Sequence, residues 1–299
     1  MFSVRVLSAF FVLAVLLTGC AKPPQRVSEP SQKLPALTKS LATQVSSYST
    51  KKPQTDARIK TASISDSVFA PKQLGRGLSG RSIYIGAQSD VKLAKGEVVI
   101  TFDDGPRPGK TDKILSILAK HDAKATFLML GQAAQRHPGL VRDVAKHGHT
   151  IGLHTHSHGD LTKVNIAAAL AEIERGQRPI EAALSPINKA PAPFFRFPYL
   201  AQTQKLRTAV NNAGLVIMDV QIDSKDYYRD GSKAVLNRTL ARLDKQGKGI
   251  ILFHDIHQRT VDMLPDFLVA LKARGYKVVS LVPERRLQLR GTTLLAQND

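Results

Sequence analysis

Two adjacent carboxylates, Asp103 and Asp104, follow directly on the apolar stretch VVITF at residues 98–102. The β-branched residues and the Phe of this stretch are typical of a buried strand, and Gly105 and Pro106 then turn the chain. Two like charges at the end of a core strand are tolerated where a divalent cation compensates them. One carboxylate can bind the ion while its neighbour, pointing to the other side, accepts a proton from water. The pair therefore suggests hydrolysis assisted by a metal ion.

Three histidines, His154, His156 and His158, lie within five residues of one another in the segment LHTHSHGD. Imidazole nitrogen is a good ligand for zinc and its first-row neighbours. In an extended segment alternate side chains share a face, and in a helical turn residues four apart do, so His154 and His158 can point the same way in either case. Together with a strand-end carboxylate they would make three ligands and leave a position free for catalysis. His156 is expected to face solvent or to support the ligands.

Strands and helices that could position these residues alternate along the chain. Strands are predicted at 98–102, 125–130, 150–153, 194–197, 215–221, 249–253 and 276–280. Helices are predicted between them, at 111–121, 139–147, 165–184, 203–213, 233–246 and 261–274. This alternation predicts an α/β fold with a parallel sheet, and about seven units favour a closed or nearly closed barrel over a doubly wound sheet.

Ionisable or polar residues follow five of the predicted strands. They are Asp103 and Asp104; His154, His156 and His158; Arg196 and Tyr199; Asp223 and Asp226; and His254 and Asp255. Functional side chains of such barrels lie at the carboxyl ends of the strands, so these groups should converge on one rim. Support of the site and simple turn formation remain equally open for Asp223, Asp255 and His257.

Five segments resemble, in their order and spacing, the motifs of the polysaccharide deacetylases, carbohydrate esterase family 4 with its NodB homology domain. The segments are TFDDGP (101–106), HTHSH (154–158), RFPY (196–199), DSKDY (223–227) and LFH (252–254). The resemblance covers roughly residues 96–283. It implies a distorted (β/α) barrel of about seven parallel strands. It also implies a hydrolase of linear amides that removes acetyl groups from N-acetylglucosamine units and releases acetate.

The resemblance also implies roles for individual residues. Asp104, His154 and His158 would bind a divalent metal ion, most often zinc, with cobalt or manganese as alternatives. Asp103 would be the general base that activates water. His254 would be the general acid that protonates the leaving amine.

Five further residues receive supporting roles from the same likeness. Arg196 would orient the base, Asp226 would tune the acid, and the backbone N–H of Tyr199 would help to hold the oxyanion. Leu252 and Tyr227 would line the acetyl pocket. The family usually has Trp where this chain has Tyr227, and the chain contains no Trp at all, which leaves the shape of that pocket open.

The first residues read as an export signal. Arg5 is followed by an apolar run at 6–17 and by LTGC, which resembles the lipobox of bacterial lipoproteins. We therefore expect a signal peptide at 1–19 and lipidation of Cys20, with an ordinary cleaved signal or an anchor helix as alternatives. A flexible tether rich in Ser, Pro and Lys is expected at 20–90, the deacetylase domain at 91–285 and a tail at 286–299.

The expected location follows from this leader. A lipid at Cys20, the single cysteine, would anchor the protein in the bacterial envelope, facing the periplasm, and Ala21 gives a modest preference for the outer membrane. A single cysteine also excludes an internal disulfide.

The formal charge of +19, with an isoelectric point near 10.1, favours polyanionic surroundings but does not choose among them. No zinc-finger, aromatic–basic or helix-turn-helix pattern accompanies it, so nucleic acid is not expected as a partner. The substrate candidates are peptidoglycan, poly-N-acetylglucosamine and chitooligosaccharide. The alternative to an enzyme is a weak or inactive glycan-binding envelope lipoprotein of the same fold, and the oligomeric state is not predicted.

Overall fold

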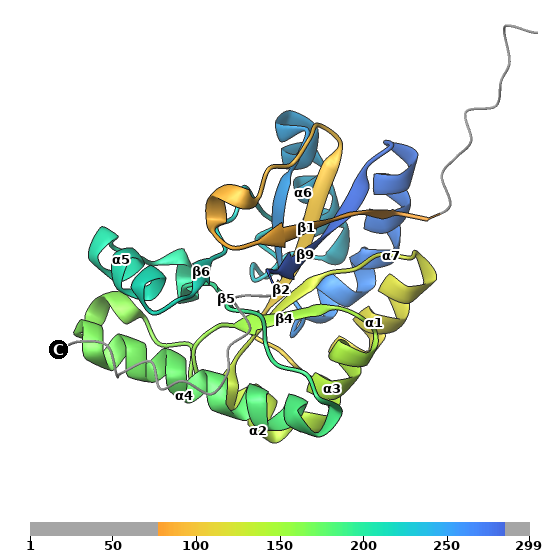
Figure 1. Ribbon diagram of the computed structural model, residues 1–299. Helices are drawn as coiled ribbons and strands as arrows, with labels where there is room; N and C mark the ends of the chain where they lie inside the picture. Colours follow the sequence, from red (N-terminus) through yellow and green to blue (C-terminus); the bar gives the residue numbers. More distant parts are fainter. Residues whose placement is uncertain (1–76, 285–299) are drawn as a thin grey trace, which may run out of the picture. The chain divides into compact units, whose positions relative to one another are not determined.

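The structure, a computed structural model, describes residues 77–284 (Figure 1). Its strands are β1 (Ser79–Ile85), β2 (Glu97–Asp103), β3 (Thr126–Met129), β4 (Thr150–Leu153), β5 (Phe194–Phe195), β6 (Val216–Ile217), β7 (Ile222–Asp223), β8 (Gly249–His254) and β9 (Lys277–Pro283). All the strand pairs are parallel, and seven strands follow one another in the order β6-β5-β4-β3-β2-β8-β7. Among the described residues no pairing joins β6 to β7, so the barrel is open on that side. The predicted distorted (β/α) barrel of about seven parallel strands is confirmed.

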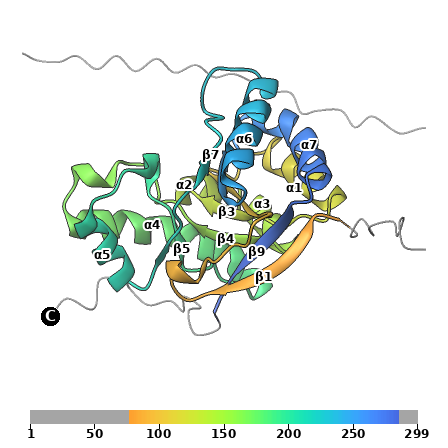
Figure 2. The ribbon, with the colours of Figure 1, turned by 90° about the horizontal axis from the view of Figure 1, so that it is seen from above.

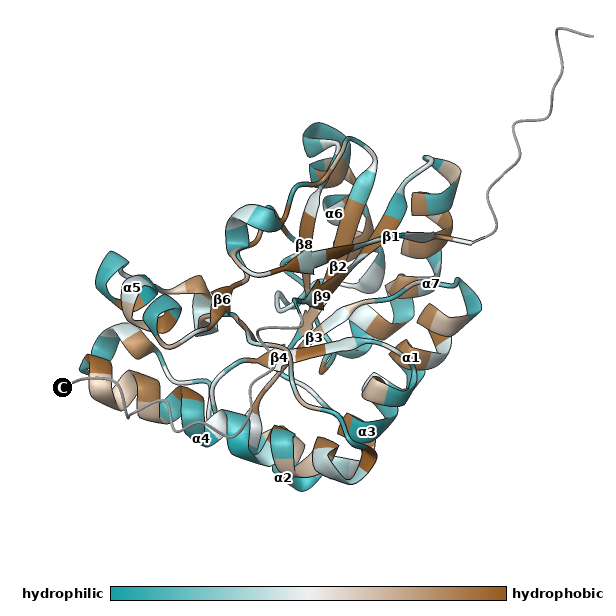
Figure 3. Cartoon of the chain, in the orientation of Figure 1, coloured by the Kyte–Doolittle hydropathy of each residue, from teal (hydrophilic) through white to brown (hydrophobic). Residues whose placement is uncertain are grey.

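Helices surround the strands (Figures 1 and 2). They are α1 (Thr111–Lys120), α2 (Gly131–Arg136), α3 (Pro138–Lys146), α4 (Ile166–Leu184), α5 (Gln204–Asn212), α6 (Ser232–Gln246) and α7 (Gln258–Ala273). Four short 3₁₀ turns lie at Gln88–Asp90, Leu161–Lys163, Ser185–Ile187 and Pro198–Leu200. The helices show hydrophobic and hydrophilic residues in alternation, while the central strands are mostly hydrophobic (Figure 3).

Side chains of β2 point alternately to the two faces of the sheet. Val98 and Ile100 belong to the larger apolar cluster, which the helices cover, whereas Val99 belongs to a second cluster inside the barrel. Thr101 and Asp103 share the inner face with Val99 because they follow it at intervals of two. The carboxyl end of β2 therefore delivers Asp103 to the barrel mouth above an apolar floor.

Three elements differ from the sequence-based expectations. The predicted tether ended too late, because β1 pairs with β9 and belongs to the folded body. Of the predicted strand at 215–221 only the two residues of β6 form a strand, and neither β7, which lies just beyond it, nor helix α2 was predicted. The predicted signal peptide, Cys20, most of the tether and the tail lie outside the described residues. Within residues 77–284 no helix has the length and apolar character that crossing a membrane requires.

Candidate active site

Asp104, His154 and His158 form a cluster at the carboxyl ends of β2 and β4. The Oδ1 atom of Asp104 lies 3.4 Å from Nε2 of His154 and 3.4 Å from Nε2 of His158. Asp104 and His158 both have left-handed backbone conformations, with φ of 77° and 62°, which non-glycine residues seldom adopt. Strained backbone of this kind gathers at functional sites, where the surrounding structure holds it.

The tautomer of His154 follows from its hydrogen bond. Nδ1 lies 2.8 Å from the carbonyl oxygen of Arg196, and since a carbonyl only accepts, Nδ1 carries the proton. Nε2 therefore turns a lone pair toward the carboxylate of Asp104. Burial would raise the pKa of Asp104, but the contacts with His154, His254 and His158 hold it below its ordinary value. Burial lowers the pKa of His158, which favours a neutral imidazole beside this carboxylate.

These donors fit a divalent metal ion. Among the described residues, the buried Oδ1 of Asp104 has no hydrogen-bond partner, an arrangement that is costly without a cation. One ligand atom from each of the three residues lies within 4.8 Å of the others. Two imidazoles and one carboxylate suit zinc and its neighbours and leave room for substrate or water.

Helices α2 and α4 hold the loop that carries the two histidines. The N–H of Gly131 donates to Thr155 O at 2.9 Å, and Glu172 accepts from the backbone and the hydroxyl of Ser157, both at 2.7 Å. His156 is half-buried and does not belong to the cluster; a Cβ on Gly131 would lie 2.8 Å from its Nδ1.

Arg196 binds Asp103, the other carboxylate of the adjacent Asp103–Asp104 pair. Its guanidinium is buried, and Nη1 donates to Asp103 Oδ1 and to Thr101 Oγ1, each at 2.8 Å. Nε donates to the carbonyl oxygen of Met218 at 2.9 Å. The second oxygen of Asp103 lies 3.9 Å from Nε2 of His154, on the side of the metal cluster. One oxygen of Asp103 is thus fixed, and the other is directed toward the place where a substrate would sit.

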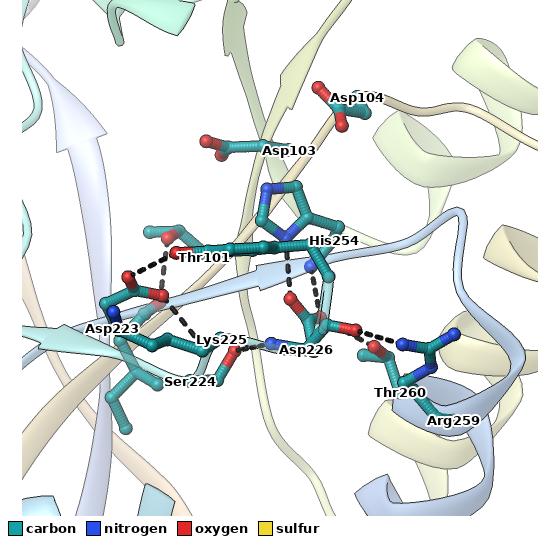
Figure 4. A network of polar contacts seen from close by, with 12 residues as sticks. Thr101, Asp103, Asp104, Asp223, Ser224, Lys225, Asp226, His254, Arg259 and Thr260 are labelled. Carbon is teal, nitrogen blue, oxygen red and sulfur yellow. Dashed lines mark hydrogen bonds and ion pairs between the residues drawn. The ribbon is translucent and has the colours of Figure 1, made fainter. Parts of the chain in front are cut away.

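His254 lies between Asp226 and the Asp103–Asp104 pair (Figure 4). Its Nδ1 is 2.6 Å from Oδ1 of Asp226, whose Oδ2 accepts from the backbone N–H of His254 at 2.7 Å and from Thr260 Oγ1 at 2.6 Å. Burial alone would lower the pKa of His254, but the hydrogen bond and the charge of Asp226 raise it to about 9. The imidazole is therefore cationic at neutral pH.

A cavity of about 360 Å³ joins these groups. Its lining consists of Asp103, Asp104, His154, His158, Phe197, Tyr199, Leu200, Asp223, Tyr227, Leu252, His254 and His257. The ring of Tyr227 stands edge-on to that of His254 at 5.6 Å, and its hydroxyl donates to Asp223 Oδ2 at 3.1 Å. Burial and then the carboxylate of Asp223 raise the pKa of Tyr227 to about 12, so the phenol stays protonated.

The structure brings together the side chains that the sequence singled out. Of the ten residues to which the resemblance gives roles, eight line the cavity, whereas Arg196 and Asp226 lie behind it and contact Asp103 and His254; Asp223 and His257 also line the cavity. Sequence reasoning missed Thr101, which the strand alternation could have found two residues before Asp103. It also missed Phe197, Leu200 and Thr260. Thr260 reaches Asp226 only because α7 approaches β7 in space, and no local signal marks it.

Comparisons with known proteins agree with this geometry. A family model described as polysaccharide deacetylase matches residues 90–218. A chitooligosaccharide deacetylase of Rhizobium leguminosarum bv. trifolii is 33% identical over 198 residues, which cover 62% of this chain and 89% of the relative. The peptidoglycan-N-acetylglucosamine deacetylase PgdA of Listeria monocytogenes is 31% identical over 186 residues, but the match covers only 38% of that longer protein.

A solved structure gives the same result. A peptidoglycan deacetylase of Bdellovibrio bacteriovorus superposes with a TM-score of 0.62 at 31% identity, covering 75% of this chain and 62% of that one. The residues that the family model matches include Asp104, His154 and His158. This chain is accordingly a member of the polysaccharide deacetylase family.

Proposed function

We propose that the protein is a metal-dependent hydrolase that removes N-acetyl groups from N-acetylglucosamine units of a polysaccharide and releases acetate. The single observation that supports this most is the partly buried Asp104–His154–His158 cluster with a base and an acid on its flanks. Relatives named peptidoglycan, chitooligosaccharide and chitin deacetylases point to the same reaction class.

Asp104, His154 and His158 would hold a divalent cation, with zinc as the leading candidate, which would supply Lewis acidity toward the acetyl carbonyl and toward water. Asp103 accepts the proton that the attacking water loses. Arg196 orients the base by donating a hydrogen bond to its Oδ1 at 2.8 Å.

His254 completes the reaction on the other side of the cavity. Cleavage of the amide needs a proton on the sugar nitrogen, because an unprotonated amine is a poor leaving group. His254 carries that proton at neutral pH, since Asp226 raises its pKa to about 9. Asp226 thus acts through His254 and does not meet the substrate.

The remaining cavity residues would position the acetyl group. Leu252 and Tyr227 line the cavity, and Tyr199, with a φ of 59°, presents its backbone at the rim. A backbone N–H directed at the developing oxyanion contributes about 3 kcal/mol in comparable sites. We assign this role to Tyr199.

The location is part of the proposal. The leader at 1–19 and lipidation of Cys20 would place the enzyme in the bacterial envelope, with the outer membrane preferred. Its substrate would be an amino-sugar polymer met there: peptidoglycan, poly-N-acetylglucosamine or chitooligosaccharide.

Acetate release tests the proposal. The protein is stripped with a chelator, assayed on peptidoglycan and on N-acetylglucosamine oligomers, and assayed again after zinc is restored. Activity should disappear and return, and Asp103→Asn should be inactive with the fold retained. Release that is independent of metal, or no release from any polymer, would contradict the proposal.

A further inference from the structure

Charge is unevenly distributed around the mouth of the barrel. Strands β7, β8 and β2 are neighbours in the sheet, and besides Lys113 and Lys233 the loops and helix starts that follow them carry five cations. These residues, which we call the cationic arc, are Arg107, Lys110, Lys225, Arg229 and Arg259. Arg107 and Arg229 are exposed, and the other three are half-buried.

Contacts between the three loops make the arc continuous. Lys110 Nζ donates to Oε1 of Gln258, the first residue of α7. Arg259 Nη1 donates to Asp226 O at 3.2 Å, which joins the segment after β8 to the loop after β7. Figure 4 shows Lys225 and Arg259 on either side of Asp226, next to the candidate general acid.

The arc has no counter-charge of its own. Within residues 77–284, no carboxylate lies within 4.0 Å of a charged nitrogen of these five side chains. The carboxylates on the same loops have other partners. Asp226 pairs with His254, Asp230 with Arg238, and Asp255 accepts from Thr111.

The opposite rim is different. The loops and helix starts after β3, β4 and β5 carry two exposed cations, Lys163, which pairs with Asp160 at 3.5 Å, and Lys205 at the start of α5. Tyr199 and Leu200 stand exposed on this side, at 69% and 38%. Tyr227 and Tyr228 on the loop after β7 are also exposed, at 44% and 45%, so the two sides of the cavity differ in the number of their cations and not in apolar character.

We propose that the cationic arc binds carboxylates of the substrate strand, so that the preferred substrate is a glycan carrying carboxylates beside its N-acetylglucosamine units. This rests on the proposed function and narrows its substrate class. Peptidoglycan strands bear such carboxylates on their stem peptides, and on the lactyl groups wherever the peptide has been removed, whereas chitooligosaccharides and poly-N-acetylglucosamine are neutral. A neutral sugar gains nothing from five unpaired cations, and an anionic strand is steered toward them.

The experiment compares one polymer in two charge states. Full-length protein is co-sedimented with peptidoglycan and with the same material after its carboxylates have been converted to amides, at about 50 and about 300 mM salt. The variant is Arg107→Gln with Arg229→Gln, because no side-chain hydrogen bond holds either residue among those described. The matched control is Lys120→Gln with Lys245→Gln, two exposed cations in the last turns of α1 and α6, at the other end of the barrel.

The arc variant should bind native peptidoglycan about 3- to 10-fold more weakly than wild type at low salt, with the difference shrinking at high salt. On amidated material the variant and the wild type should bind alike, and the control should match wild type on both. If the wild type binds native and amidated peptidoglycan equally, or if the control variant loses as much binding as the arc variant, the proposal that the cationic arc binds carboxylates is contradicted. Acetate release from N-acetylglucosamine oligomers is measured separately. A protein that lacks deacetylase activity can then be distinguished from one whose cationic arc does not bind carboxylates.

Discussion

The protonation of His254 depends on a single buried partner. Asp226 is fully buried. One of its oxygens contacts Nδ1 of His254, and the other accepts hydrogen bonds from the backbone N–H of His254 and from the hydroxyl of Thr260. Burial would raise the pKa of Asp226, but its contacts with His254 and Thr260 lower that pKa, so Asp226 stays ionised. The pKa of His254 is therefore raised by a carboxylate that lies on the side away from the substrate and does not contact it.

Asp226→Asn should shift the basic limb of the pH–rate profile. The acid works only when protonated, so the wild-type rate falls as pH rises through about 9. Loss of the charge lowers the pKa of His254, and the limb should move to lower pH by about one unit or more. The measurement is kcat/KM against pH on N-acetylglucosamine oligomers. The control is Asp230→Asn, on the same loop but paired with Arg238, and it should leave the basic limb where it is in the wild type. If the basic limb of Asp226→Asn does not move, Asp226 does not set the pKa of the acid.

At the scale of elements, the histidine loop owes its conformation to two glycines. A Cβ on Gly131 would lie 2.5 Å from Gly176 Cα, and one on Gly176 would lie 2.4 Å from the carbonyl of Thr155. Helices α2 and α4 can approach the loop this closely only because both residues lack a side chain. Sequence periodicity predicted α4 within one residue of its bounds but missed the six-residue α2, whose polar sequence GQAAQR carries no apolar stripe.

Gly176→Ala should therefore loosen the metal site. The added methyl group meets backbone and cannot be accommodated by rotating a side chain, so we expect a loss of about 1–3 kcal/mol in unfolding free energy and weaker zinc binding. Gly139→Ala is the matched control, because its Cβ would meet only a side-chain atom of Arg142 at 3.8 Å. Urea unfolding and zinc titration of both variants decide the matter. A Gly176→Ala protein as stable as the control, with undiminished zinc affinity, would contradict this account.

At the scale of the whole molecule, β1 and β9 add two strands to the seven of the open barrel and side chains to its inner cluster. Ile83 and Ile85 of β1, with Val279 and Leu281 of β9, belong to the inner cluster that also contains Val99 of β2. The family model begins only at residue 90, and the sequence predicted a tether up to that point. The strand was missed because only these two isoleucines of β1 are buried, among exposed Ser, Arg and Tyr. The motif residues and the long strands could be predicted from the local sequence, whereas β1, β6 and β7 form only by pairing with strands distant in the sequence.

Ile85→Ala tests the contribution of β1 to the barrel. Ile85 is 0% exposed, and its truncation should lower the unfolding free energy by about 2–5 kcal/mol. Tyr84→Ala, one residue away and 64% exposed, should change it by less than about 0.5 kcal/mol. Equal thermal stability of the two variants would mean that β1 does not belong to the core.

The most direct test of the whole account is a calorimetric titration of zinc into the metal-stripped protein. The wild type should bind one equivalent through Asp104, His154 and His158. Asp104→Ala and His158→Ala should each weaken that binding by about 100-fold or more, while His156→Ala should retain it. A wild type that takes up no zinc, or Asp104→Ala and His158→Ala proteins that bind it as tightly as wild type, would contradict the metal centre on which the proposed reaction depends.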